Sequence, residues 1–482
     1  MERCKRFSEK KEGLYLTLSN DKQQYQKEQD ELLKVVLNER FFKTFHDGPL
    51  HADEPSLWHN SELEIYITNA CNQHCEYCYF VKYPELYDAP KDSDTLKHNL
   101  RLLLDYFYEH QYVPRVVDLF SGEIWHTQLG LDILEIVLKY VRQGWAIPKI
   151  MICSNGTFLM DQLQLHKIQN IIDMFAELGV QLQFSFSVDG KYIDEQFRPR
   201  NNNDHYLDDF YDTLFAFAKH NTFYFHPMVS SKNVKYWIEN LKWWIDQCDY
   251  YGMDLFEWVM MLEVRNPDWT EESIQEYNNF MDKLLEYTLH NYCNDDKTKF
   301  LNTLLGIRLH NSAGLNGYIP YMLNKTYDFT ACSICGEFIV RLGDLAICPC
   351  HRTAYNKYLY GNFVVEDDKI VDIHANNPTF AIQILMANHH YGLHGCDTCL
   401  YKDICLRGCF GAQLEALGDP LFPLENVCMF FKAKYSHLLK KYEEYGAFEY
   451  AKSIGPQELR YEYVQILISL YEQWRQQNGM AR

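Results

Sequence analysis

The sequence of 482 residues has no long hydrophobic run. No apolar stretch approaches the roughly 18 residues that a membrane-spanning helix needs. The opening "MERCKRFSEKKEG" lacks the apolar core of a signal peptide. We therefore expect a cytoplasmic protein without a membrane partner.

Positive charge is also in short supply. Lys and Arg number 46 against 66 Asp and Glu, which gives a formal net charge of −20. Binding to a phosphate backbone needs a basic surface, so we expect no nucleic-acid partner. A basic peptide would suit this charge, although such an excess is usually only a solvated surface.

Cysteine, in contrast, is abundant. The chain has 16 cysteines, and in a reducing compartment clustered cysteines serve metal binding or catalysis more often than disulfides. Four stand alone and are predicted to be small buried hydrophobes: Cys4, Cys153, Cys248 and Cys293. The others form two groups, one at 71–78 and one between 332 and 428.

Between residues 61 and 310, short β-rich runs alternate with longer segments of helical period. The β-rich runs are 63–68, 115–120, 149–153, 182–188, 223–229 and 255–261. Six strand–helix units in a row predict a parallel sheet with right-handed crossovers. Six units do not close an eight-stranded barrel, so we predict an α/β fold with a partial (β/α)6 TIM barrel.

The remaining regions differ from the barrel in composition and periodicity. Residues 1–60 predict an extension with one strand, "GLYLTL", and a helix at 21–44. In 326–435 cysteines recur and periodicity is weak, so metal ligation rather than a large apolar core is expected to hold this region together. Residues 436–482 predict a helical segment.

Small and polar residues follow the predicted strands. "SGE" follows the second strand, "SNGT" the third, and "SVDG" lies within and after the fourth. Each of these loops alone could be a simple turn. Because the carboxyl ends of parallel strands share one edge, together they predict a site there.

The stretch "CNQHCEYC" (71–78), directly after the first strand, has the spacing C-x3-C-x2-C. A structural zinc site usually takes four ligands, whereas this loop offers three, and His74 is interpreted as a solvated loop residue. Three thiolates on a tight loop suit a four-iron cluster with one iron left open. An open iron can take a ligand that carries chemistry.

This stretch resembles the C-x3-C-x-aromatic-C motif of radical S-adenosylmethionine (SAM) enzymes, with Tyr77 at the aromatic position. The resemblance implies that Cys71, Cys75 and Cys78 hold a catalytic [4Fe-4S] cluster whose open iron chelates SAM. It implies that an electron from the cluster cleaves SAM to a 5′-deoxyadenosyl radical, which abstracts hydrogen from a substrate. A reductant such as flavodoxin or ferredoxin is the implied partner.

Further residues match the family one at a time. "FSGEI" is similar to the Gly-Gly-Glu-Pro loop that holds the amino group of SAM; Gly122 and Glu123 match, whereas the flanking Ser and Ile depart from it. Ser187 in "SFSVDG" matches a serine that contacts the nucleoside. Arg198 matches an arginine that pairs with the methionine carboxylate, at a spacing from Ser187 that is one residue short.

The second cysteine group contains "CDTCLYKDICLRGC" (396–409). Taken alone it could be a zinc ribbon, but it resembles the SPASM domain, which carries two auxiliary [4Fe-4S] clusters. The resemblance implies three clusters in all, and it assigns Cys332, Cys335, Cys350 and Cys409 to the first auxiliary cluster and Cys396, Cys399, Cys405 and Cys428 to the second. Cys348 is the alternative to Cys350 as a ligand of the first auxiliary cluster. We favour Cys350 because Pro349 directs its two neighbours apart and "PCHR" resembles the text around the ligand in relatives.

The SPASM resemblance implies a peptide or protein substrate. We expect a radical maturase of a ribosomally synthesised peptide, with cross-link formation. The alternatives are oxidation of a protein side chain, as in sulfatase formylglycine formation, and a radical enzyme acting on a small molecule. Sulfatase maturases place an Asp base after the third auxiliary-cluster cysteine, where this chain has His351. A non-catalytic iron–sulfur electron carrier would need no open iron and no nucleoside loops.

Overall fold

The computed structural model describes residues 22–37, 62–87, 91–200, 208–305, 337–376, 395–396, 398–402, 404–405, 409–457 and 461–479. The predicted strand "GLYLTL", residues 38–44 of the predicted first helix, and both Cys332 and Cys335 lie outside these ranges.

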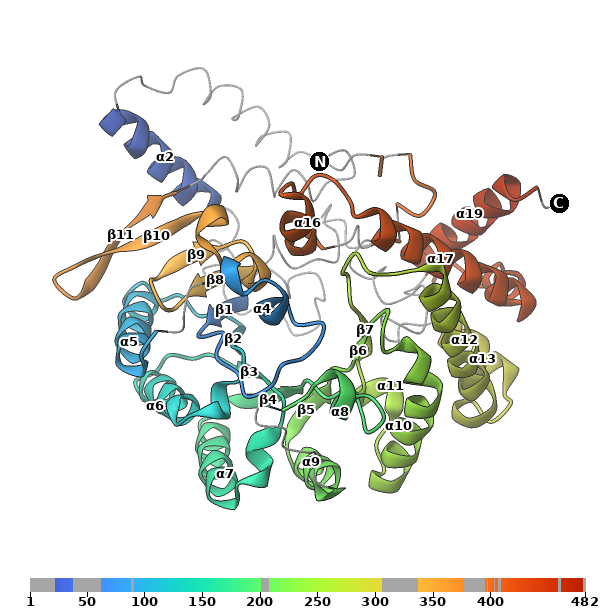
Figure 1. Cartoon of the computed structure of the whole chain (residues 1–482), viewed down its shortest axis with the longest axis horizontal. Helices are drawn as coiled ribbons and strands as arrows, with labels where there is room; N and C mark the ends of the chain where they lie inside the picture. Colours follow the sequence, from blue (N-terminus) through green and yellow to red (C-terminus); the bar gives the residue numbers. More distant parts are fainter. Residues whose placement is uncertain are drawn as a thin grey trace.

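The centre of the molecule is a parallel sheet. Its five central strands are β1 (Glu62–Tyr66), β2 (Val116–Phe120), β3 (Lys149–Ser154), β4 (Gln181–Phe186) and β5 (Thr222–Phe225). A separate parallel pair, β6 (Met228–Val229) and β7 (Leu262–Glu263), follows them. Figure 1 shows the strands as an inner arc and helices as an outer arc. The predicted partial (β/α)6 barrel is confirmed.

The helices of the outer arc connect successive strands. They are α5 (Ser93–Glu109), α6 (Leu129–Arg142), α7 (Gln162–Glu177), α9 (Asp208–His220), α10 (Trp237–Tyr251) and α12 (Glu271–Tyr287). Helix α5 begins where the Asp92 carboxylate accepts hydrogen bonds from the backbone N–H groups of Asp94 and Thr95. Its predicted apolar stripe is buried: Leu96, Leu100, Leu103, Leu104 and Phe107.

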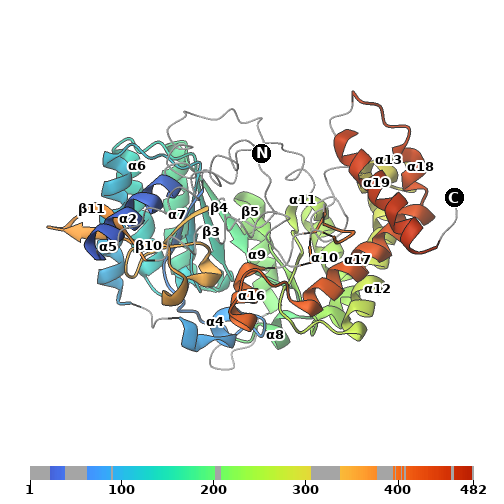
Figure 2. The same ribbon diagram turned by 90° about the horizontal axis from the view of Figure 1, so that it is seen from above.

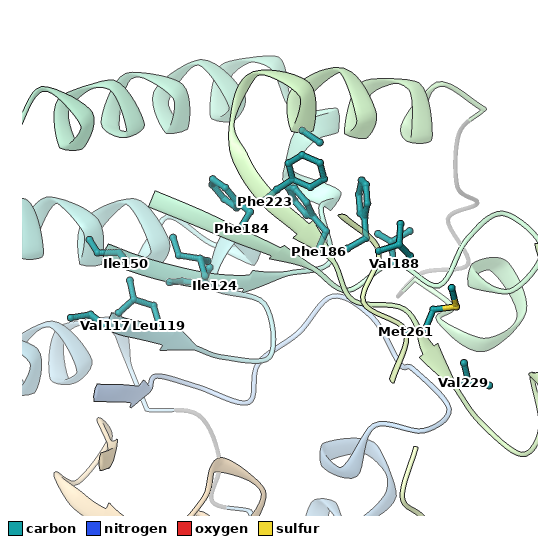
Figure 3. Close-up of a cluster of buried hydrophobic side chains, with 14 of the residues drawn as sticks. Val117, Leu119, Ile124, Ile150, Phe184, Phe186, Val188, Phe223, Val229 and Met261 are labelled. Carbon is teal, nitrogen blue, oxygen red and sulfur yellow. The ribbon is translucent and has the colours of Figure 1, made fainter. Parts of the chain in front are cut away.

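The two faces of the sheet differ in chemistry because side chains alternate along a strand. One face carries apolar residues under the helices, among them Val117, Ile150 and Phe184 (Figure 3). The opposite face carries polar residues at the intervening positions, including the buried Glu64 and Ser185. The core thus lies between sheet and helices, and polar chemistry is left for the inner face.

The prediction of a strand at 255–261 was wrong. Residues Leu255–Trp258 form the short helix α11, and the strand β7 begins only at Leu262. Helix α11 begins because the Asp254 side chain accepts hydrogen bonds from the N–H groups of Phe256 and Glu257. The expected strand at 223–229 is interrupted at Pro227, which has no N–H for a ladder.

The region 326–435 contains more regular structure than its sequence predicts. Strand β8 (Glu337–Arg341) pairs in parallel with β1, and β9 (Ala346–Cys348), β10 (Gly361–Glu366) and β11 (Lys369–Ala375) continue the sheet in antiparallel fashion. The sheet order is β11-β10-β9-β8-β1-β2-β3-β4-β5. One continuous sheet therefore crosses the predicted division between barrel and cysteine-rich region.

The two ends of the chain pack on this framework. Helix α2 (Lys22–Leu37) lies against β11, where the Asp30 carboxylate accepts a hydrogen bond from the N–H of Ala375 at 2.7 Å. The C-terminal part is helical as predicted, with α18 (Ala447–Ala451) and α19 (Tyr461–Gln477), but α17 (Glu425–Glu444) starts before the predicted boundary. Helix α13 (Lys297–Leu305) contacts α18. None of the helices in the described ranges has the length and hydropathy that a membrane crossing requires.

Candidate active site

The cysteine triplet lies on the loop between β1 and the short helix α4 (Tyr79–Lys82). Cys78 is the residue before α4, and its N–H donates to the carbonyl of Cys75 at 3.0 Å. The pKa of the Cys71 thiol is raised to about 12, mainly by burial and also by charge on Glu123 and Cys78. The pKa of Cys75 is raised by burial and also by charge on Cys71 and Cys78. The three thiols are therefore close enough to influence one another electrostatically.

The triplet fits a four-iron cluster better than a single ion. In the described part of the chain, no three His, Cys, Asp or Glu side chains converge as ligands of one metal ion. A [4Fe-4S] cluster places each thiolate on a different iron, so its ligands stand farther apart than those of one ion. All three thiols are partly exposed in this structure.

The loop after β2 is fastened to the start of the triplet loop. The N–H of Gly122 donates to the Thr68 carbonyl at 2.7 Å, and the N–H of Glu123 donates to the Ala70 carbonyl at 2.9 Å. A Cβ on Gly122 would stand 2.4 Å from the Ala70 carbonyl oxygen. Only glycine permits this approach, which explains why Gly122 agrees with the family motif.

Glu123 is buried and surrounded by donors. Its carboxylate accepts from the N–H of Asn155 at 2.6 Å, the hydroxyl of Ser154 at 3.0 Å and the N–H of Trp125 at 3.2 Å. Burial nevertheless raises its pKa to about 7, and these hydrogen bonds oppose the rise. A buried carboxylate at the carboxyl end of β2 can accept hydrogen bonds from an amino group, which is the role the motif implies.

The loop after β3 also contacts the triplet. The Asn72 amide donates to the Thr157 hydroxyl at 2.8 Å and accepts from the Asn155 amide at 2.7 Å. The sequence marks "SNGT" as a polar loop but does not single out Asn72 or Asn155. Their signal is weak, because asparagine in a loop usually marks a turn.

Arg198 is not a surface residue: 4% of it is exposed. Its guanidinium donates to the Tyr77 hydroxyl and, at 3.4 Å, to the Gln73 side-chain oxygen. It also lies 3.5 Å from Asp194 and 4.0 Å from Asp189. Charge on Arg198 lowers the pKa of all three triplet thiols. The structure therefore places Arg198 directly behind the triplet loop.

The turn after β4 contributes more to the site than its sequence suggests. Asp189 is fully buried, accepts from the Tyr77 hydroxyl at 2.8 Å and from the N–H of Met228 at 2.7 Å, and has its pKa raised to about 7 by burial. Gly190 has a φ of +118°, and a Cβ there would stand 2.6 Å from the Asn240 side-chain oxygen, so the turn requires glycine. Ser187 lies on the same turn, partly exposed, with its N–H bonded to the Ser154 carbonyl.

Segments of the second cysteine group that are distant in the sequence lie close together. Arg352, two residues after Cys350, donates to the Cys409 sulfur at 3.7 Å. Charge on Cys396 and Cys399 raises the pKa of Cys428, which burial raises to about 11. This arrangement fits the interleaved assignment of Cys350 with Cys409 and of Cys396 and Cys399 with Cys428. Cys405, the remaining predicted ligand of the second set, is partly exposed, as a cluster ligand needs to be.

Cys348 and Cys350 have different surroundings. Cys348 is 2% exposed and packs with apolar residues that include Ile339 and Leu359. Cys350 is partly exposed, and its charge raises the pKa of Tyr79, the residue after Cys78. The structure thus buries Cys348 in the core and leaves Cys350 partly exposed near Tyr79.

His351 lies at the carboxyl edge of the barrel. Its Nδ1 is 2.9 Å from the carboxylate of the buried Glu64 on β1, and its ring stacks on Phe120 at 4.1 Å. Phe120 directly precedes the "SGE" loop. The sequence leaves open whether His351 is a structural loop residue; the structure places it beside the predicted SAM site.

The structure is a parallel half-barrel in which three thiols follow the first strand and the loops after β2, β3 and β4 surround these thiols. This arrangement defines a class of enzymes that bind an iron–sulfur cluster at the carboxyl edge of the sheet. Residues 65–243 match the sequence model of the radical SAM superfamily. These residues form a radical SAM domain, and a domain of this kind indicates an enzyme that cleaves SAM. Such a domain implies one [4Fe-4S] cluster, and SAM, as cofactors.

Solved structures show the same fold. Native anSMEcpe with bound AdoMet, an anaerobic sulfatase-maturating enzyme, matches with a TM-score of 0.53 at 16% identity, over 82% of this chain and 100% of that chain. Native anSMEcpe with bound AdoMet and the Cp18Cys peptide matches with a TM-score of 0.51 at 15% identity, over 80% of this chain and 98% of that chain. No curated protein is a significant match.

Proposed function

We propose that this radical SAM enzyme is a maturase that abstracts hydrogen from a ribosomally synthesised peptide and forms a cross-link in it. The observation that carries the proposal is that segments of the second cysteine group lie close together although they are distant in the sequence. Arg352 of the Cys350 segment contacts Cys409, and Cys428 lies within electrostatic reach of Cys396 and Cys399. A SPASM domain with two auxiliary clusters requires such contacts between distant cysteine segments.

When bound, SAM and the clusters supply reductive cleavage, hydrogen-atom abstraction and acceptance of the second electron that cross-linking releases. The chain's own residues bind and orient SAM and the clusters. Cys71, Cys75 and Cys78 hold the first cluster, Gly122 and Glu123 receive the amino group of SAM, and Ser187 the nucleoside. A flavodoxin or ferredoxin is the proposed electron donor.

A protein side chain is the second candidate substrate. The likeness to anSMEcpe spans that whole chain, which favours oxidation such as formylglycine formation. His351 stands where sulfatase maturases place an Asp, and its bond to Glu64 gives this position a different chemistry. We therefore rank peptide cross-linking above side-chain oxidation and above a small-molecule substrate.

Anaerobic reconstitution tests the cofactors. We expect about twelve irons in three four-iron clusters. Replacing Cys71, Cys75 and Cys78 together by Ala should remove roughly a third of this iron and all formation of 5′-deoxyadenosine. Replacement of the buried, isolated Cys248 should change neither. Retained SAM cleavage in the triple variant would exclude the assignment of the triplet.

Mass spectrometry separates the candidate reactions. The enzyme is incubated with reductant, SAM and either peptides encoded near its gene or a sulfatase-derived Cys peptide. Cross-linking removes two hydrogens from the peptide, whereas formylglycine formation removes two hydrogens and also replaces the thiol sulfur by a carbonyl oxygen. Only the second product, formed from the sulfatase peptide, would reverse our ranking.

A further inference from the structure

Arg352 lies between the cysteine triplet and the second cysteine group. It belongs to the turn that follows Cys350, and this turn packs against α16 (Phe410–Leu417), which begins directly after Cys409. Figure 2 shows α16 on the same side of the molecule as α4, the helix that follows Cys78. In the sequence, Arg352 is only the last residue of "PCHR", and no role is assigned to it there.

The guanidinium is fixed in place by an acidic partner and an amide. Its Nε and Nη2 bind the two carboxylate oxygens of Glu415 at 2.8 and 2.5 Å, and Nη2 also donates to Asn266 at 2.9 Å. The Glu415 side chain is completely buried, and 12% of the Arg352 side chain is exposed. A bidentate pair of this kind sets direction as well as position.

The same close packing holds the aliphatic part of the side chain. A Cβ on Gly411 would stand 2.7 Å from Cγ of Arg352. The absence of a side chain at Gly411 therefore lets the first turn of α16 approach Arg352. This approach brings Cys409, the residue before that turn, within reach of the guanidinium.

The remaining edge of the guanidinium faces sulfur. Nη1 donates to the Cys409 Sγ at 3.7 Å. On the other side, the guanidinium carbon lies 5.4 Å from the centre of the Tyr79 ring, and charge on Arg352 lowers the pKa of Cys78. Arg352 thus contacts a predicted auxiliary-cluster ligand while it lies near the triplet.

We propose that Arg352 is a positioning residue that donates an N–H···S hydrogen bond to Cys409 and thereby raises the reduction potential of the first auxiliary cluster. The proposal rests on the proposed function, because it needs Cys409 to be a cluster ligand. Hydrogen bonds to ligating sulfur are one of the means by which proteins set cluster potentials. A donor stabilises the reduced cluster more than the oxidised one, because reduction adds negative charge to the sulfurs.

The ion pair with Glu415 keeps the effect of Arg352 on the reduction potential local. The carboxylate offsets most of the guanidinium charge at longer range. The directional bond to Cys409 remains, so the first auxiliary cluster should respond more than the other two. A purely long-range charge effect would move the potentials of all clusters together.

Potentiometric titration followed by electron paramagnetic resonance tests this on the fully reconstituted enzyme. Arg352→Gln removes the charge and the fork of donors. Arg352→Lys keeps the charge but cannot bind Glu415 and Cys409 at once. The control is Arg475→Gln, since Arg475 pairs with Glu443 on the C-terminal helices.

We expect both Arg352 variants to keep all iron and to lower the midpoint potential of one cluster more than those of the other two, with the control unchanged. Unchanged potentials in both variants, an unaltered potential in the Lys variant alone, or an equal shift of all clusters would overturn the proposal. If Arg352→Gln loses iron, the Lys variant decides, and loss of iron there too would overturn it. Only about four irons in the unmodified enzyme would instead refute the auxiliary clusters of the proposed function.

Discussion

The Tyr77 hydroxyl donates a hydrogen bond to Asp189 at 2.8 Å and so joins the cysteine triplet to the turn after β4. The same hydroxyl accepts from Arg198. Asp189 is fully buried, and burial raises its pKa to about 7. The loop that carries the triplet is therefore held by a network of charged groups beneath it. Changes to Tyr77 and Arg198 in this network should have measurable effects.

Replacing Tyr77 by Phe removes a donor from a buried carboxylate. We expect the free energy of unfolding to fall by about 1–3 kcal/mol, because a buried acceptor loses a partner. Urea unfolding measures this difference. Tyr108→Phe is the matched control, since that hydroxyl donates to the Gln143 carbonyl on the surface. An equal, small effect of both variants would contradict the prediction.

Replacing Arg198 by Ala should weaken SAM binding while the cluster content stays unchanged. A lost charge-assisted pair costs about 1–3 kcal/mol, roughly tenfold to a hundredfold in affinity. Calorimetry measures the affinity and iron analysis the content. Unaltered binding would refute the assignment of Arg198 to the SAM carboxylate and make Arg200 the next candidate.

SAM affinity should depend on pH through Glu123. Burial raises the pKa of this carboxyl from its ordinary 4.5 to about 7, so protonation begins near neutral pH. The ionised form accepts hydrogen bonds from the amino group, so affinity should fall as the pH drops below about 7, at most tenfold per unit. Calorimetry at pH 6 and 8 tests this, and Glu123→Ala should lose the dependence. A pH-independent affinity in the unmodified enzyme would contradict it.

Cys348 should be dispensable for iron and Cys350 should not. Cys348 is buried among apolar side chains, whereas Cys350 is partly exposed beside Tyr79. Iron and sulfide analysis of Cys348→Ala and Cys350→Ala compares them directly. Loss only in Cys348→Ala would reverse the assignment, and loss in both would refute the count of eight auxiliary ligands.

The ion pair of Lys434 on α17 with Glu263 on β7 measures 2.5 Å, and both side chains are 1% exposed. Lys434→Met would leave a buried carboxylate without its cation. We expect a loss of about 3–5 kcal/mol in the free energy of unfolding. The double variant with Glu263→Leu should recover most of it, and failure of this recovery in urea unfolding would show that the loss comes from packing.

The sequence by itself determined the barrel and the triplet. Strands β1 to β4 lie within two residues of their predicted ends. Buried parallel strands have short apolar sequences, and these stand out between segments with the periodicity of a helix. The triplet could be recognised because its three cysteines lie within one local loop. The error at 255–261 came from a short apolar run in which the helix start at Asp254 outweighed β propensity.

Only the tertiary structure decided the rest. Three features depend on residues far apart in the chain: the burial of Arg198 behind the triplet, the contact of Glu64 with His351, and the contact of Arg352 with Cys409. Parallel pairing of β8 with β1 likewise joins the cysteine-rich region to the barrel across the predicted domain division. Local patterns report propensity and period, whereas such long-range contacts arise only when the sheet assembles and packs, so no local pattern carries them.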